Sequence, residues 1–362
     1  MSHRSSQTTS PSRFPVPGFS LVELMVALTV GLILLTGLVK IFSSTRQTYQ
    51  LNSNLARLQE NARFAVELMS REIAMAGYWG CISDVSPINV LNTPNNYSWA
   101  FNDRVRGYDN SSPSSFPSAF QSDVLTGTDA IVLSGIDPDP FTIESHNACS
   151  AQFKLAQSHD LLDDEIVFVT DCMQGAIFQI TNANQANQTI VHNTGTGTIG
   201  NYTKCLGGNC GGACATTWYE YGPDAMLARF RAVAFYIGTG ASGEPALFWE
   251  VLNRGGTTSA GELVDGVENL QILYGWDTDA TADGVANQYV SAAVVDAADD
   301  WSNVVSVRLG LLLRTTDNVR SGLDSTTYTI AGTDIGVSGT TVTHTSDLRV
   351  RKVAGTTIQL RN

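Results

Sequence analysis

Residues 18–42 read GFSLVELMVALTVGLILLTGLVKIF, and this stretch decides the architecture of the N-terminal part of the chain. Only Glu23 and Lys40 are charged within it. At about 1.5 Å per residue, a helix over residues 19–42 is about 36 Å long, enough to cross a bilayer. An ordinary secretory signal has a shorter apolar run with its cleavage site after it. Here the polar segment 1–18 comes first, so the sequence predicts a retained transmembrane or filament-core helix over 19–42.

The helical pattern continues beyond the apolar run. Apolar side chains recur at steps of three and four residues and so define one face of a helix. This face consists of Leu51, Leu55, Leu58, Ala62, Ala65, Met69 and Ile73. The opposite face carries Asn52, Arg57, Glu60, Arg63, Glu67 and Arg71. No proline interrupts the pattern, and Gly77 is a suitable helix stop, so we predict one long helix over 19–76.

Residues 77–362 have the composition of a β-rich globular domain. Runs of β-branched and aromatic residues alternate with Asn-, Ser- and Gly-rich turns, and no alternation of strands with helices appears. The expected strands are 129–135, 165–172, 176–181, 229–237, 246–253, 270–276, 304–315, 340–345, 348–353 and 356–362. The predicted class is therefore α+β, with a long N-terminal helix packed on a mainly antiparallel sheet. Residues 86–122 and 181–216 are expected to be loops.

The charge of the chain excludes one broad function. The formal net charge is −13, and the Lys and Arg residues form no basic stripe interleaved with aromatics. Phosphate contacts need clustered cations, so direct nucleic-acid binding by the bulk surface is not expected.

The six cysteines all follow the apolar run. They are Cys81, Cys149, Cys172, Cys205, Cys210 and Cys214. The spacing of the last three lacks the paired CxxC pattern or nearby His of a zinc site. An even number in an oxidising compartment favours disulfides, and six cysteines can pair in about 15 ways. We predict disulfides and leave the pairing open.

Glu23 needs an explanation, because a carboxylate within an apolar membrane helix costs roughly 2.5–3.5 kcal/mol. One interpretation is that Glu23 lies near the lipid headgroups and is tolerated there. The other is that it finds a cationic partner during assembly. An α-amino group created at Phe19 of a neighbouring subunit would be such a partner.

The string from Gly18 to Leu28 resembles the class III signal of type IV prepilins and type II secretion pseudopilins. The resemblance implies cleavage between Gly18 and Phe19 by a prepilin peptidase, which would remove the leader 1–18. It also implies N-methylation of Phe19 and an assembly contact between Glu23 and the N-terminus of a neighbouring subunit.

Four further stretches resemble PilW-type minor pilins of type IV pili. They are residues 58–81, 262–277, 289–315 and 351–362. The resemblance implies a subunit that helps to initiate pilus assembly and joins a minor-pilin complex at or near the tip. Its partners would be other minor pilins, the major pilin, the prepilin peptidase, the inner-membrane assembly platform and a large tip adhesin. The chain would cross the inner membrane once, with residues 77–362 in the periplasm before assembly and on the pilus afterwards. The resemblance implies that the pilus would support twitching motility, adhesion or DNA uptake.

Two alternatives stay open. A J-type minor pseudopilin of type II secretion shares the signal, the long helix and the β-rich domain. A membrane-anchored ectodomain, such as a sensor or hydrolase that never enters a filament, is the alternative from a different class.

The acidic segment around Asp277, Asp279 and Asp283 is the best metal candidate. Alternating Asp residues followed by Gly284 can surround calcium with oxygen ligands, although the spacing departs from that of an EF-hand. The other interpretation is a solvated acidic turn between strands. Calcium is the one cofactor considered. No His pair at metal spacing, nucleophile elbow or phosphate loop appears, so we do not expect an enzyme.

Overall fold

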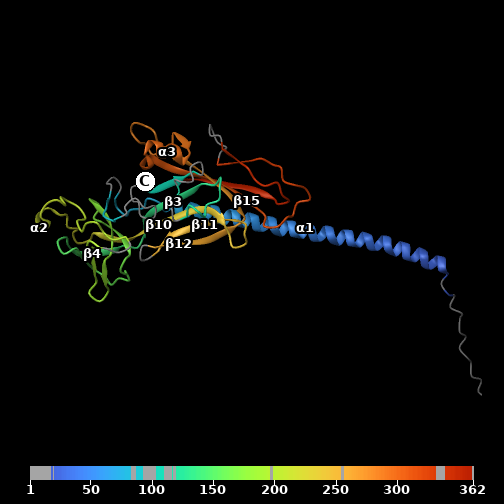
Figure 1. Ribbon diagram of the computed structural model, residues 1–362, viewed down its shortest axis with the longest axis horizontal. Helices are drawn as coiled ribbons and strands as arrows, with labels where there is room; N and C mark the ends of the chain where they lie inside the picture. Colours follow the sequence, from blue (N-terminus) through green and yellow to red (C-terminus); the bar gives the residue numbers. More distant parts are fainter. Residues whose placement is uncertain are drawn as a thin grey trace, which may run out of the picture. The chain divides into compact units, whose positions relative to one another are not determined.

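The computed structural model describes residues 18, 20–82, 87–92, 103–109, 116, 120–195, 199–253, 257–331 and 339–360 (Figure 1). The chain divides into two compact units, with the boundary between Ser53 and Asn54. A helix, α1 (Leu21–Met75), begins in the first unit and ends in the second.

The first unit contains the apolar part of α1. The Ser20 hydroxyl accepts a hydrogen bond from the Glu23 backbone N–H (3.2 Å), which caps the start of the helix. Glu23 lies in the first turn, where the helix dipole favours a negative charge. The large apolar side chains of residues 21–42 are exposed, and α1 is long and apolar enough to cross a membrane.

The second unit begins with the amphipathic part of α1, whose apolar face is buried as the sequence predicts. The helix residues in the main core are Leu58, Ala62, Ala65, Met69 and Ile73. Each buried Leu, Met or Ile contributes roughly 1.5–3 kcal/mol through removal of its apolar surface from water. The helix ends before Gly77, whose positive φ (76°) fits the left-handed conformation of a helix stop. Its backbone N–H donates to Ser134 O (2.9 Å), which ties the helix end to the sheet.

The first half of the second unit is mostly strand. Its elements are β1 (Ile88–Asn89), β2 (Val105–Tyr108), β3 (Ala130–Ile136), β4 (Phe141–Asn147), β5 (Gln152–Leu155), β6 (Ile166–Thr170), β7 (Gly175–Gln179), β8 (Asn182–Asn184), β9 (Thr189–Val191), α2 (Cys214–Thr217) and β10 (Met226–Thr239). The second half contains β11 (Pro245–Leu252), β12 (Thr258–Asp265), β13 (Val267–Trp276), β14 (Gln288–Val290), α3 (Ala292–Ala298), η2 (Trp301–Asn303), β15 (Val304–Arg314), β16 (Tyr328–Ile330), β17 (Thr340–Val342) and β18 (Arg351–Gln359).

Among the described residues, these strands form one large sheet, a four-stranded sheet of order β14-β13-β15-β18 and the β16–β17 pair. Every pairing is antiparallel except that of β1 with β7, again within the described part of the chain. The predicted α+β class with a mainly antiparallel sheet is confirmed.

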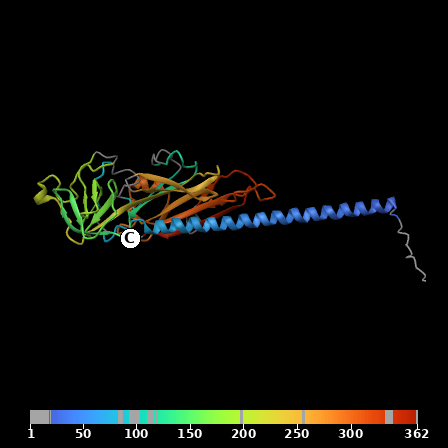
Figure 2. The same cartoon turned by 90° about the horizontal axis from the view of Figure 1, so that it is seen from below.

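Strand β10 joins two parts of the large sheet. Its first residues pair with β6 and β4, whereas residues from Phe230 onward pair with β3 and then with β11. Ile136 at the end of β3 lies opposite Phe230. Residues 137–225 therefore form an insertion between two adjacent strands, and we call it the cysteine-rich lobe. Figures 1 and 2 show this lobe, with β4 and α2, at the end of the second unit away from β15.

The structure differs from the predicted elements in several places. It contains the strands β4, β5, β12, β14 and β16 and the helix α3 where no element was predicted. The supposed loop 181–216 contains β8, β9 and α2. The two short strands expected at the C-terminus are one strand, β18, because Arg351–Gln359 pairs continuously with β15. The expected loop 86–122 contains β1 and β2; much of the rest of it lies outside the described residues.

Candidate functional site

The N-terminal signal lies at the start of α1. Gly18 and Ser20 are exposed, and Glu23 is exposed in the first helical turn. Phe19, the residue predicted to be cleaved and methylated, lies outside the described residues, as does the leader 1–17. The exposure of Gly18 leaves the backbone at the predicted cleavage site accessible to a peptidase. Glu23 comes four positions after Phe19 in the sequence.

All six cysteines are in disulfides, and the structure supplies the pairing that the sequence left open. The pairs are Cys81–Cys172, Cys149–Cys214 and Cys205–Cys210. The last two close loops within the cysteine-rich lobe. Cys81 follows the end of α1, so its bond to Cys172 in the turn between β6 and β7 tethers the lobe to the helix end. The tethered residues are 91 apart in sequence. A disulfide typically contributes on the order of 2–4 kcal/mol, mainly by constraining the unfolded chain.

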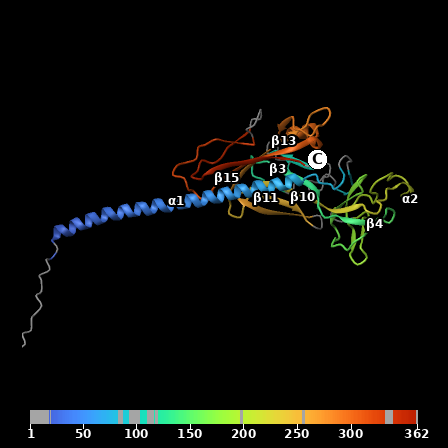
Figure 3. The ribbon, with the colours of Figure 1, turned by 180° about the vertical axis from the view of Figure 1, so that it is seen from behind.

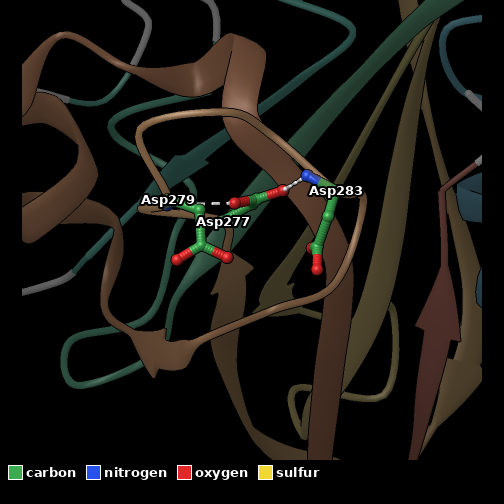
Figure 4. Close-up of side chains that lie close together, drawn as sticks. All are labelled: Asp277, Asp279 and Asp283. Atoms are coloured by element: carbon green, nitrogen blue, oxygen red, sulfur yellow. Dashed lines mark hydrogen bonds between the residues drawn. The ribbon is translucent and has the colours of Figure 1, made fainter.

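The three predicted metal ligands do lie together, in the loop between β13 and β14 (Figure 4). Asp277 is buried, and both of its carboxylate oxygens accept backbone hydrogen bonds. Its Oδ1 accepts from the N–H of Asp279 (3.1 Å), and its Oδ2 accepts from those of Asp283 and Gly284 (2.9 Å each). The hydrogen bonds from these three backbone N–H groups lower the pKa of Asp277, and that from Gly284 has the largest effect. Burial acts in the opposite direction, but the three hydrogen bonds outweigh it. Asp277 thus organises the loop with its own carboxylate.

The remaining acids of the loop have a different environment. Asp279 and Asp283 are exposed, and Asp283 accepts a hydrogen bond from the Val285 N–H (2.9 Å). One oxygen from each of the three carboxylates lies within 4.8 Å of the others. Carboxylate oxygens at this spacing suit calcium chemically. Calcium binding stays a prediction, since the backbone bonds to Asp277 also explain the loop.

We expect Asp277→Asn to lower the melting temperature by about 2–4 °C, with or without a chelator, because an amide group would face two N–H donors. The exposed Asp279→Asn is the matched control and should leave the melting temperature unchanged in chelator. If calcium binds, adding it raises the melting temperature of the unchanged chain but not that of Asp279→Asn. A fall for Asp277→Asn that appears only with calcium present would contradict the backbone role. Thermal unfolding with added calcium or EDTA measures all of these outcomes.

The structure contains an ionic cluster that the sequence did not predict, and this cluster joins the four-stranded sheet to its flanking loops. We call it the arginine–carboxylate network, and it consists of Arg314, Arg320, Arg349, Arg351, Glu244, Glu268, Asp324 and Asp347. The Arg351 side chain is 0% exposed and lies at its centre. It donates to Glu268 (2.6 and 3.1 Å), to Asp347 (2.8 and 3.1 Å) and to Asp324 (3.3 Å).

The pKa of one carboxylate in the network, that of Asp324, is strongly lowered. Burial alone would raise the pKa of Asp324. Hydrogen bonds from Thr326 and Tyr328, with the charge of Arg320, outweigh burial and lower this pKa to about 2. The four arginines and four acids balance in charge. The cluster therefore fixes the C-terminal strand β18 rather than forming a charged binding surface.

The described geometry defines a class of protein. A capped, apolar N-terminal helix with an exposed Gly18 at its start continues into a disulfide-linked, β-rich unit, and this combination is that of a pilin-like protein. Residues 17–39 match the family model of the prokaryotic N-terminal methylation motif. The chain is thus a type IV pilin-like protein involved in pilus assembly.

The second match is more particular. Residues 234–362 match the family model described as type IV pilus-assembly protein W (PilW). The two matches together support a PilW-type type IV minor pilin, and the resemblance drawn from the sequence is confirmed. The PilW match begins within β10, so the cysteine-rich lobe lies outside it. No curated protein and no solved structure matches the chain significantly.

Proposed function

We propose that this protein is a minor pilin that helps to initiate type IV pilus assembly and is then incorporated into the pilus, in a minor-pilin complex at or near the tip. The observation that carries the proposal is the combination of the methylation motif over residues 17–39 with the PilW match over residues 234–362. Both matched families are structural, and we propose no enzymatic activity.

The N-terminal chemistry follows from the signal. A prepilin peptidase would cut between Gly18 and Phe19, and the new amine of Phe19 would be methylated. Glu23 would then pair with the N-terminus of the neighbouring subunit, which lowers the cost of placing its carboxylate in apolar surroundings. The partners are the major pilin, other minor pilins, the inner-membrane assembly platform and a large tip adhesin.

The second unit would lie in the periplasm before assembly and on the pilus afterwards. The support for this orientation is that every cysteine of the chain is in a disulfide. Disulfides persist in oxidising compartments such as the periplasm and are rare in the cytosol. The helix α1 would anchor the unit in the inner membrane until the subunit enters the filament.

The mature N-terminus tests the proposal. We expect mass spectrometry of sheared filaments to find a chain that begins at methylated Phe19. The membrane fraction should contain the same species in the pool awaiting assembly. A chain that keeps residues 1–18 and occurs only in membranes would refute the proposal and favour the static ectodomain. A processed chain that co-purifies with a secretion pseudopilus instead of a pilus would favour the J-type pseudopilin.

A further inference from the structure

Two buried histidines meet in the core of the cysteine-rich lobe. His146 lies on β4, and His192 follows β9 directly. Their Nε2 atoms are 3.1 Å apart, and the residues are 7% and 0% exposed. The ring of His146 stacks on Phe153 of β5, with ring centroids 3.9 Å apart. The pair therefore has protein on every side rather than water.

The hydrogen bonds assign the protons of the pair. The backbone N–H of Tyr221 donates to Nδ1 of His146 (3.2 Å), so a neutral His146 carries its proton on Nε2. That proton points at Nε2 of His192, which must accept it. His192 then carries its own proton on Nδ1, a buried atom with no hydrogen-bond partner in the described part of the chain. The arrangement is consistent only with two neutral rings.

Protonation breaks this arrangement in two places. A proton added to Nδ1 of His146 would face the N–H of Tyr221, donor against donor. A proton added to Nε2 of His192 would face the N–H of His146 in the same way. Each added charge would also be buried, which is unfavourable unless the charge is paired.

The surrounding elements offer little to compensate a cation. The charged residues on the segments packed around the pair are Glu144 on β4, Lys154 on β5, Lys204, Glu220 and Asp224. Glu144 and Lys154 pair with each other (3.0 Å), and Lys204 donates to Cys149 O (2.8 Å). Glu220 accepts from the Ala148 N–H (3.2 Å). Tyr219 and Tyr221 also titrate, and their hydroxyls donate to Asp171 and to Leu206 O.

We propose that the His146–His192 pair is an acid-sensitive clamp, which holds β4, the end of β9 and the segment 218–221 together at neutral pH and releases them in acid. The Cys149–Cys214 disulfide keeps β4 and the segment 218–221 tethered through the turn after β4 and the start of α2, so the lobe opens without unravelling. The clamp does not depend on the proposed role in a pilus.

The lowered pKa values of His146 and His192 set the pH range over which the lobe opens. Burial lowers the pKa of His146 to about 4. Burial, with smaller effects from His146 and Lys204, lowers the pKa of His192 to about 3. An imidazole in the open lobe has a pKa of about 6.5. Below that value the open form binds more protons than the closed form, so the closed form loses stability as pH falls. At pH 5 each ring favours opening about 20-fold more than at pH 7.

Hydrogen–deuterium exchange mass spectrometry of the full chain in detergent micelles tests the clamp at pH 7 and pH 5. We expect the protection factors of peptides covering 143–153, 189–193 and 219–222 to fall at least tenfold, after correction for the intrinsic exchange rate. Peptides from β13 and β15 are the internal control and should change less than twofold. The shifted carboxylate Asp324 titrates at lower pH and does not contribute in this range.

Variants separate the clamp from a purely structural role of the two rings. His146→Gln combined with His192→Phe should remove the fall between pH 7 and pH 5, whereas His159→Gln and His344→Gln should retain it. Exchange of the imidazole C2 hydrogens in the unchanged chain gives each pKa directly and needs no variant. Midpoints below pH 5 for His146 and His192 support the clamp. Midpoints near 6.5, or equal protection at the two pH values, overturn it.

Discussion

Gly18→Arg is expected to stop processing completely, so the chain stays at full length in the membrane and none enters filaments. The physical reason is local: the predicted cut lies directly after residue 18, where a glycine leaves room for the peptidase and a long cation does not. Gly18→Ala is the matched control and should retain some cleavage, because it adds only a methyl group. Immunoblots of membrane and sheared-filament fractions, with mass spectrometry of the N-terminus, measure both. Efficient cleavage of Gly18→Arg would contradict the signal assignment.

Glu23→Ala separates assembly from processing at the same signal. We expect normal cleavage and methylation, with at least a tenfold fall in the amount that reaches the filament. Without the carboxylate, the amine of the neighbouring Phe19 would be left unpaired in apolar surroundings, and breaking a buried pair costs about 3–5 kcal/mol. A tenfold change in incorporation corresponds to only about 1.4 kcal/mol. The expected fall therefore holds even if solvent or lipid headgroups solvate the unpaired amine and offset part of the energy lost. Glu60→Ala, on the exposed face of α1, is the control, and wild-type filament levels of Glu23→Ala would count against the pairing.

Arg351→Met is expected to lower the free energy of unfolding by about 3–5 kcal/mol. Arg351 contacts Glu268, Asp324 and Asp347, and its loss leaves three arginines for four acids, so the network keeps one uncompensated negative charge. Lys352→Met is the matched control, because Lys352 is the next residue on β18 and is exposed. Its effect should stay within about 0.5 kcal/mol. Urea unfolding followed by circular dichroism compares the variants.

The pH dependence gives a second check on the same network. The lowered pKa of Asp324 means that its contribution to stability is fully present above about pH 4. That contribution should disappear as pH falls toward 2. The difference in stability between Arg351→Met and the unchanged chain should therefore shrink over this range. A difference that stays constant down to pH 2, or a loss below 1 kcal/mol at pH 7, would show that the network is not a unit.

The helix and the class of protein could be predicted because their signals are local. The spacing of Leu58, Ala62, Ala65, Met69 and Ile73 places these residues on one face, and the structure buries that face. The signal around Gly18 and Glu23 is a continuous string whose meaning does not depend on the rest of the chain. The main strands were also predictable from β-branched and aromatic runs.

The boundaries of several strands were not predictable for a physical reason. Arg351–Gln359 is one strand because its nine residues pair in register with β15, whose partner residues lie 37 to 53 positions earlier in the chain. Strands β8 and β9 have only three residues each, and β8 (Asn182–Asn184) is polar. β8 is stabilised by pairing with β9, which pairs in turn with β5, rather than by its own propensity. Figure 3 shows β15 and β13 side by side, with β4 and α2 at the far end of the second unit.

The sequence by itself determined the membrane helix, its amphipathic continuation, the β-rich class and the presence of disulfides, since these follow from composition and short-range periodicity. Only the tertiary structure decided the disulfide pairing, the insertion of residues 137–225 between β3 and β10, the arginine–carboxylate network and the His146–His192 pair. Most of the contacts that make up these features join residues far apart in the chain. Their contacts depend on strand order and register, which a local pattern does not encode.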